Sequence, residues 1–297
     1  MAHEAYLVGR DQVSLERPFD ASDKLFAANR IDGKTMDQAS FGHCTFANVS
    51  FKEVTIKNGQ FLNCAFIGCY LRRATITDCR FTGCKFIECN FSHATITGSD
   101  FRYSSFRDCY VPWESLEHNL PSEPNLRAEL TRNLSIEAAK LGAIKDSRLY
   151  RRCEIEANEE HLSAAVRGQT EWYRQHFDGW HRIVAAFEWL LSALNGIAWG
   201  YGERSWVLIR NYLLLSIIVF PILFLFMSEG LVSKDGKNIG FIDAFYFSLQ
   251  NMLHGGIESG IQAATAATRF CAGLESTLGV IMAGLLASYV FRWSLRR

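Results

Sequence analysis

Large apolar side chains recur at every fifth position along the first half of the chain. The series comprises Phe41, Phe46, Phe51, Ile56, Phe61, Phe66, Leu71, Ile76, Phe81, Phe86, Phe91, Ile96, Phe101, Phe106 and Val111. A period of five matches neither the 3.6-residue repeat of a helix nor the two-residue repeat of a long strand. It does match very short strands that each end in a corner, because residues i and i+2 of a strand point to the same side. The pattern therefore predicts a square coil with the large residues inside.

The length of one coil can also be read from the pattern. The segments EVTIK (53–57), RATIT (73–77) and HATIT (93–97) lie twenty residues apart. Four sides of five residues make one turn, so equivalent residues stack at roughly 4.8 Å, the spacing of neighbouring strands. The pattern resembles the pentapeptide-repeat family over residues 37–112. The resemblance implies a right-handed quadrilateral β-helix, preceded by an N-terminal segment at 1–36.

Seven of the nine cysteines share one position in this repeat, two residues before a large residue. They are Cys44, Cys64, Cys69, Cys79, Cys84, Cys89 and Cys109. Zinc sites usually pair cysteines two to four residues apart, so this spacing predicts small interior residues and neither a metal nor a cofactor. Stacked cysteines also fall within the Cα range of a disulfide. However, the chain shows no signal-peptide pattern, and seven buried thiols favour a reducing compartment.

The second half of the chain contains two long apolar runs, at 206–228 and 273–293. Each is long enough to cross a bilayer as a helix. Arginines flank the pair on its outer sides, at Arg204, Arg210, Arg292, Arg296 and Arg297. Positive residues stay on the cytoplasmic side. We therefore expect a multi-pass protein of the cell inner membrane with both termini in the cytoplasm.

Two segments connect the halves. Residues 113–180 are charged and amphipathic, and they predict a soluble helical connector that Gly142 and Asp146 could divide into a helix pair. Residues 181–203 carry a polar stripe beside Trp and Phe residues, which favours an amphipathic helix in the membrane interface. A third span at 181–199 is the alternative.

The segment between the two apolar runs resembles a potassium-channel pore. Residues 241–253 are apolar but too short to span, and a glycine-rich loop follows within 241–260, which is the layout of a re-entrant segment. Residues matching the start of the family's pore helix are Asp243, Ala244, Tyr246, Phe247 and Ser248. The run 274–290 resembles the family's inner helix and includes Glu275, Gly279 and Gly284, of which the two glycines are implied in gating. The resemblance implies an α-helical two-span pore module at 204–297.

The filter positions differ from the potassium-channel pattern. They read His254, Gly255, Gly256, Ile257 and Glu258. Potassium selectivity needs successive rings of backbone carbonyls, and Glu258 replaces a glycine that helps to form them. A ring of carboxylates attracts cations in general, so we expect weak selectivity.

The resemblance to the potassium-channel pore implies a tetramer. Together, these features predict a membrane channel for monovalent cations, regulated through a cytoplasmic β-helix that binds an unidentified protein or small molecule. The alternative is a non-conducting, membrane-anchored scaffold or sensor, including a membrane-disrupting effector of stress response or phage defence. No catalytic constellation or nucleotide motif is apparent, so an enzyme is not expected. Residues 37–111 carry six acidic and eight basic residues, so the coil is not expected to imitate or bind nucleic acid.

Overall fold

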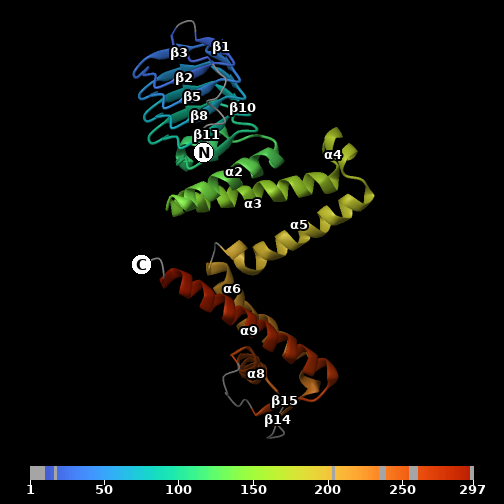
Figure 1. Cartoon of the computed structure of the whole chain (residues 1–297). Coiled ribbons are helices and arrows are strands. Elements are labelled where there is room, and N and C mark those ends of the chain that lie inside the picture. The colour runs from blue at the N-terminus through green and yellow to red at the C-terminus, as the bar shows by residue number, and fades with distance from the viewer. Residues whose placement is uncertain (1–10, 17–18, 203–204, 234–238, 254–259, 295–297) are drawn as a thin grey trace. The chain divides into compact units, whose positions relative to one another are not determined.

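The computed structural model of the chain describes residues 11–16, 19–202, 205–233, 239–253 and 260–294 (Figure 1). The chain divides into two compact units, Met1–Trp189 and Leu190–Arg297. Each unit has its own core.

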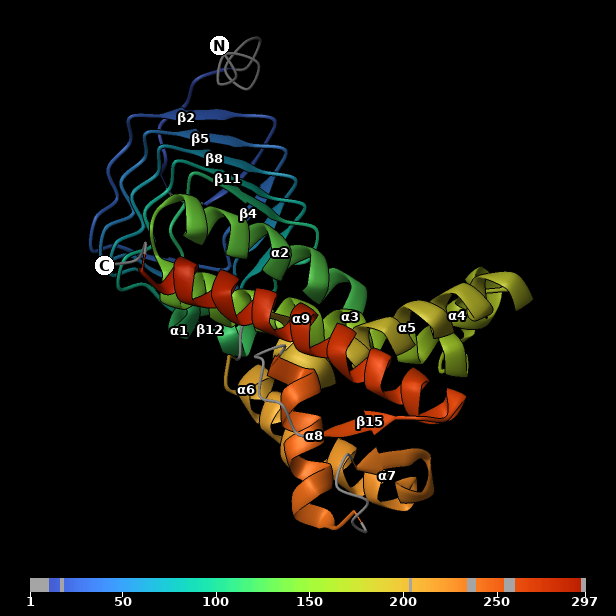
Figure 2. The same cartoon turned by 90° about the horizontal axis from the view of Figure 1, so that it is seen from below.

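The first unit is a four-sided β-solenoid. Its strands are β1 (Asp20–Ser22), β2 (Leu25–Ala27), β3 (Thr35–Asp37), β4 (Ser40–Gly42), β5 (Thr45–Ala47), β6 (Thr55–Lys57), β7 (Gln60–Leu62), β8 (Ala65–Ile67), β9 (Thr75–Thr77), β10 (Arg80–Thr82), β11 (Lys85–Ile87), β12 (Thr95–Thr97) and β13 (Ser105–Arg107). Three sides are parallel sheets, in the orders β1-β4-β7-β10, β13-β11-β8-β5-β2 and β12-β9-β6-β3. Single bridges form the fourth side, for example between Ser50 and Tyr70. Figure 2 shows the stacked coils from below. The predicted square coil is confirmed.

The core of the solenoid is a stack of phenylalanine rings. Partner strands pair residues twenty apart, such as Phe46 with Phe66. The rings of Phe46 and Phe66 stack at 4.8 Å and those of Phe66 and Phe86 at 4.9 Å between centroids. Many corners need a left-handed residue, and Asn48 and Asn63 supply it with φ of 53° and 50°. Asparagine tolerates this conformation better than most residues. The five-residue step thus sets both the core and the corners.

The solenoid begins before the predicted boundary at residue 37. Strands β1 and β2 already belong to its sheets, and Gln12 bridges to Leu25. The reason is that the five-residue step continues backward through Met36, Ile31 and Phe26, which are all buried. The expected N-terminal segment 1–36 is therefore largely coil over its described residues.

Helices follow the last coil and close it. They are α1 (Trp113–Leu116), the 3₁₀ turn η2 (Glu117–Asn119), α2 (Pro124–Lys140), α3 (Ile144–Arg167) and α4 (Glu171–His176). The predicted break into a helix pair is present, with Gly142 at a φ of 78° between α2 and α3. Leu130 and Leu134 of α2 and Tyr150 of α3 are buried in the same core as the phenylalanine stack. Residues 113–167 are therefore helical, as expected for the connector, and they also form the cap of the solenoid.

The rest of the chain contains helices α5 to α9, short helical turns and two short strands. Their bounds are α5 (Gly179–Trp199), η3 (Gly200–Gly202), α6 (Ser205–Leu214), the π-turn η4 (Leu215–Val219), α7 (Phe220–Phe226), η5 (Ser228–Gly230), β14 (Leu231–Ser233), α8 (Phe241–Leu253), β15 (Ile261–Ala263) and α9 (Ala266–Ser294). By length and composition, the helical stretches Trp206–Phe226 and Ala266–Phe291 could each cross a membrane. Helix α5 is not among these candidates.

The second candidate span begins earlier than the expected residue 273. The backbone N–H of Thr268 donates to Oγ1 of Thr265 at 3.3 Å, so Thr265 caps α9 just before its first residue. A threonine cap satisfies an amide that the helix leaves free. The helix therefore starts at the cap and not where the apolar run starts.

Candidate functional site

The two ends of the segment between the candidate spans lie side by side. Strand β14 follows the first span and β15 precedes the second, and they pair antiparallel with Leu231 opposite Ala263 and Ser233 opposite Ile261. Helix α8 lies between them in the sequence. It has 13 residues and is therefore about 20 Å long at 1.5 Å per residue, which is shorter than a bilayer core of about 30 Å. The chain thus leaves the β14–β15 pair, forms a half-length helix and returns to it.

Helix α8 is fixed at its start by a predicted pore-helix residue. The backbone N–H of Gly240 donates to Oδ2 of Asp243 at 3.0 Å. An acid in the first turn that reaches back to this amide is one half of a capping box, and its charge suits the positive end of the helix dipole. Asp243 therefore has a local structural role that accounts for its position.

One face of α8 packs against both candidate spans. Phe247 is 5% exposed, and its ring meets that of Phe224 edge-on at 4.9 Å. Helix α8 also lies close to α9. A Cβ added at Gly279 of α9 would overlap the carbonyl of Met252 in α8, so a glycine is needed where the two helices meet. A Cβ at Gly284 would meet nothing within 4 Å. Of the two glycines implied in gating, only Gly279 makes a close helix contact within one copy of the chain.

The other predicted pore-helix residues differ in environment. Tyr246 is 49% exposed, whereas Ser248 is completely buried. The predicted filter residues His254, Gly255, Gly256, Ile257 and Glu258 lie outside the described residues, so the structure gives no geometry for them.

A buried polar cluster joins three helical elements of this unit. The Ser248 hydroxyl of α8 makes hydrogen-bond contacts with Oε1 of Glu275 in α9 and, at 3.2 Å, with the backbone oxygen of Ser216 in the π-turn η4. Ser248 and Glu275 are 0% exposed and Ser216 is 2% exposed. The sequence pattern identified Ser248 and Glu275 separately but did not pair them. The available signal was an acidic residue inside an otherwise uncharged apolar run.

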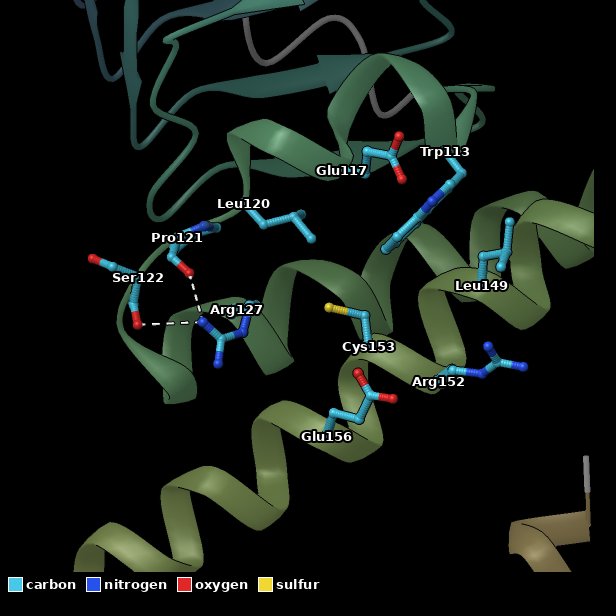
Figure 3. A pocket seen from close by; sticks show the side chains of 10 residues that line it. All are labelled: Trp113, Glu117, Leu120, Pro121, Ser122, Arg127, Leu149, Arg152, Cys153 and Glu156. Atoms are coloured by element: carbon cyan, nitrogen blue, oxygen red, sulfur yellow. Dashed lines mark hydrogen bonds between the residues drawn. The ribbon is translucent and has the colours of Figure 1, made fainter.

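A second candidate site lies in the solenoid cap. A cavity of about 400 Å³ opens between α1, η2, α2 and α3, with Trp113, Arg127, Arg152 and Glu156 in its wall (Figure 3). Arg127 is held in place because Nη1 donates to the carbonyls of Pro121 and Ser122, each at 3.3 Å. The volume falls in the range of small-molecule sites. The mixed charges favour a small polar ligand.

A cysteine also lines the cavity. Its one thiol, Cys153, is half-buried, and burial raises the pKa of that thiol above its ordinary value, so it is not an activated nucleophile. Within the described part of the chain, no group of three His, Cys, Asp or Glu residues could hold a metal ion.

The seven repeat cysteines are interior residues of the solenoid. All seven are buried. The Cys84 thiol donates to the carbonyl of Phe61 at 3.3 Å, and the Cys64 thiol donates to that of Phe41 at the same distance. Burial raises the pKa of the Cys79 and Cys89 thiols. Such thiols are small, weakly donating core residues, as the repeat predicts.

The chain has similarity to known proteins in its first unit. No curated protein matches it. A pentapeptide repeat protein from the thylakoid lumen of Arabidopsis thaliana is 18% identical, with a TM-score of 0.25, over 36% of this chain and 66% of that one. Full-length QnrB1, a plasmid-mediated fluoroquinolone resistance protein, is 15% identical, with a TM-score of 0.20, over 28% of this chain and 49% of that one. The chain therefore spans half to two thirds of these proteins.

A family model gives the more direct match. The pentapeptide repeat region matches residues 34–111, which contain the phenylalanine stack and the seven repeat cysteines. With the four-sided geometry already described, this match establishes that the chain carries a pentapeptide-repeat β-solenoid, followed by helices of which two could cross a membrane.

Proposed function

We propose that the protein is a membrane channel whose pore is formed by residues 204–297 from four copies of the chain and conducts monovalent cations. The observation that carries the proposal is the β14–β15 pair, which brings together the two ends of the segment containing α8. A half-length helix that enters and leaves on one side of a pair of spans is the layout of a re-entrant pore segment. Such a segment is tolerated in a bilayer only where protein or a water-filled cavity surrounds it.

The exposed surface of the module is compatible with the proposed assembly of several copies. Along α9, Val280, Ile281 and Val290 are each more than half exposed within one copy. In a bilayer such side chains face lipid or a neighbouring copy. One copy cannot enclose a pore, so the proposal requires an oligomer, and the resemblance to the potassium-channel pore implies a tetramer.

The proposed ion preference rests on Glu258. In the alignment from Asp243, this residue stands where a channel filter has its second glycine. Four carboxylates at a pore mouth would concentrate cations without selecting potassium over sodium. The proposal is therefore a weakly selective cation channel.

The pentapeptide solenoid is the proposed regulatory part, on the cytoplasmic side of the inner membrane. Helix α5 presents Ile183, Phe187 and Ile197, each at least 60% exposed, and is proposed to lie in the membrane interface. The cavity beside Arg127 and Arg152 is the proposed site for a small polar ligand. Neither role requires catalysis.

Recordings from the purified protein in planar bilayers, with mixed potassium and sodium, test this function. We expect cation currents with similar permeability for the two ions. Glu258→Gln should lower the conductance several-fold without changing the oligomer, because the carboxylate ring is lost. Glu229→Gln is the matched control, since Glu229 is an exposed acid in the same connection between the spans, and it should leave the conductance unchanged.

Three outcomes would contradict the proposal. Strong potassium selectivity would mean that the loop is misaligned and that Glu258 is not at the mouth. Anion selectivity unaffected by Glu258→Gln would mean the same. Absence of any current from an intact, membrane-inserted oligomer would favour the alternative, a non-conducting scaffold or sensor.

A further inference from the structure

The Ser248–Glu275 cluster lies deep within the two candidate spans. Glu275 is nine residues after Ala266 and Ser216 is ten residues after Trp206, where these spans begin. At 1.5 Å per residue these positions are about 14 and 15 Å along their helices, which is close to the middle of a bilayer core of about 30 Å. Acidic residues at this depth are rare, costly when charged and usually functional.

Among the described residues, no counter-ion contacts Glu275. It is the only buried Asp, Glu, Lys, Arg or His among the described residues of the second unit. The described groups around Glu275 are neutral. They are the Ser248 hydroxyl, the Ser216 carbonyl that this hydroxyl also contacts, and the amide of Asn251. An ionised carboxylate in this position would be a buried charge without a partner, which is strongly unfavourable.

Counting hydrogens gives a second, independent reason for a neutral group. The Ser248 hydroxyl carries one hydrogen and contacts two oxygens, Oε1 of Glu275 and the carbonyl oxygen of Ser216. If Glu275 were ionised, both oxygens would be acceptors, and one contact would have no hydrogen. If Glu275 is protonated, its hydroxyl donates to Ser248 Oγ and Ser248 donates to Ser216. Both contacts are then hydrogen bonds.

The last oxygen of Glu275 fits the same arrangement. Oε2 of Glu275 and Nδ2 of Asn251 are buried without a hydrogen-bond partner among the described residues. Asn251 is three residues after Ser248, so it lies on the same face of α8. An amide N–H from Asn251 can donate to the carbonyl oxygen of a protonated carboxyl with a small side-chain adjustment. Every polar atom of the cluster would then be satisfied.

We infer that Glu275 is held as a neutral carboxylic acid that joins three elements by a chain of hydrogen bonds, from α9 through Ser248 of α8 to the Ser216 carbonyl of the first span. The π-turn η4 contributes because a π-turn displaces carbonyls from the regular helix pattern, and such turns are frequent at functional sites. Glu275 is thus a positioning residue. It holds α8 against both spans.

This inference rests on the proposed membrane placement of the two spans but not on conduction. Its test is the infrared spectrum of the full-length protein in lipid vesicles near neutral pH. The carbonyl stretch of a protonated carboxylic acid should be present in the wild type and lost in Glu275→Gln. The control Glu229→Gln should retain the band. The second readout is a hydrophobic carbodiimide, which reacts with protonated carboxyls within membranes; mass spectrometry should find the adduct on Glu275.

The conservative variant separates positioning from mere packing. Gln can donate its amide N–H to Ser248 Oγ, so Glu275→Gln should keep the oligomer and the thermal stability close to wild type, whereas Glu275→Leu, similar in size and without polar atoms, should lower both. A wild-type spectrum without the band, together with no adduct at Glu275, would overturn the inference. If the band is present but the bilayer recordings show no current, the inference stands and the proposed channel function fails.

Discussion

At the residue scale, one position of the repeat is occupied by chemically different residues that make the same contacts. Ser104 follows Cys84 in the stacked column, and its hydroxyl donates to the carbonyl of Phe81, as the Cys84 thiol does to Phe61. On another side of the solenoid, Asn119 is the last residue stacked at this position, and its side-chain amide donates to the carbonyl of Ile96 at 2.9 Å. The sequence predicted a small interior residue here. The carbonyl it contacts, 23 residues earlier, could not be predicted without the geometry of the corner.

Substitutions at Cys84 test this equivalence. Cys84→Ser should leave the thermal stability of the full-length protein almost unchanged, because Ser104 shows that a hydroxyl fits the same site one coil later. Cys84→Ala removes the hydrogen bond to Phe61 and the volume of the sulfur, and should cost about 1–2 kcal/mol. Melting temperatures of the three proteins in one detergent provide the measurement. Equal melting temperatures for the Ala and Ser variants, or stoichiometric zinc that is lost with either one, would show that the role is different.

At the element scale, helix α2 replaces the next strand of the solenoid. The side chain of Asn133 both accepts from the Phe106 backbone N–H at 2.7 Å and donates to the Phe106 carbonyl at 2.9 Å. Glu137, which is 4% exposed, accepts from the Asp108 backbone N–H at 2.7 Å. Terminal repeats of solenoids need such caps, because an open strand edge invites aggregation. The apolar spacing predicted the helix, but Asn133 and Glu137 look like solvent-exposed positions until the strand edge is known.

Removing the Asn133 side chain should therefore destabilise the cap. Asn133→Ala leaves the backbone N–H and carbonyl of Phe106 without partners, and should lower the stability by about 1–3 kcal/mol. Asn125→Ala is the matched control, because Asn125 is an exposed residue of the same helix, and it should have little effect. Hydrogen exchange followed by mass spectrometry should show faster exchange in β13 for Asn133→Ala alone. Unchanged exchange in β13 would mean that α2 is not what protects this edge.

At the scale of the whole molecule, the parts predicted best were those with a long periodic or apolar pattern. The stack from Phe41 to Val111 repeats the same five-residue step many times. A long apolar run predicts a helix long enough to cross a bilayer, whatever elements surround it. By contrast, the β14–β15 pair depends on three-residue strands far apart in the sequence. The Ser248–Glu275 contact joins residues 27 positions apart. Contacts of this kind depend on packing between elements, so local pattern does not predict them.

The sequence also predicts the orientation of the chain in the membrane. If both candidate spans cross the membrane, the two ends lie on one side, and the arginines outside the pair predict that this side is the cytoplasm. Reporter fusions at residues 1 and 297 should both behave as cytoplasmic, and a reporter inserted at Lys234, between the spans, as external. An insertion at Gly142, in the turn between α2 and α3, is the control and should match residue 1. If residues 1 and 297 report opposite sides, α5 would be a third span, because an odd number of crossings is then required.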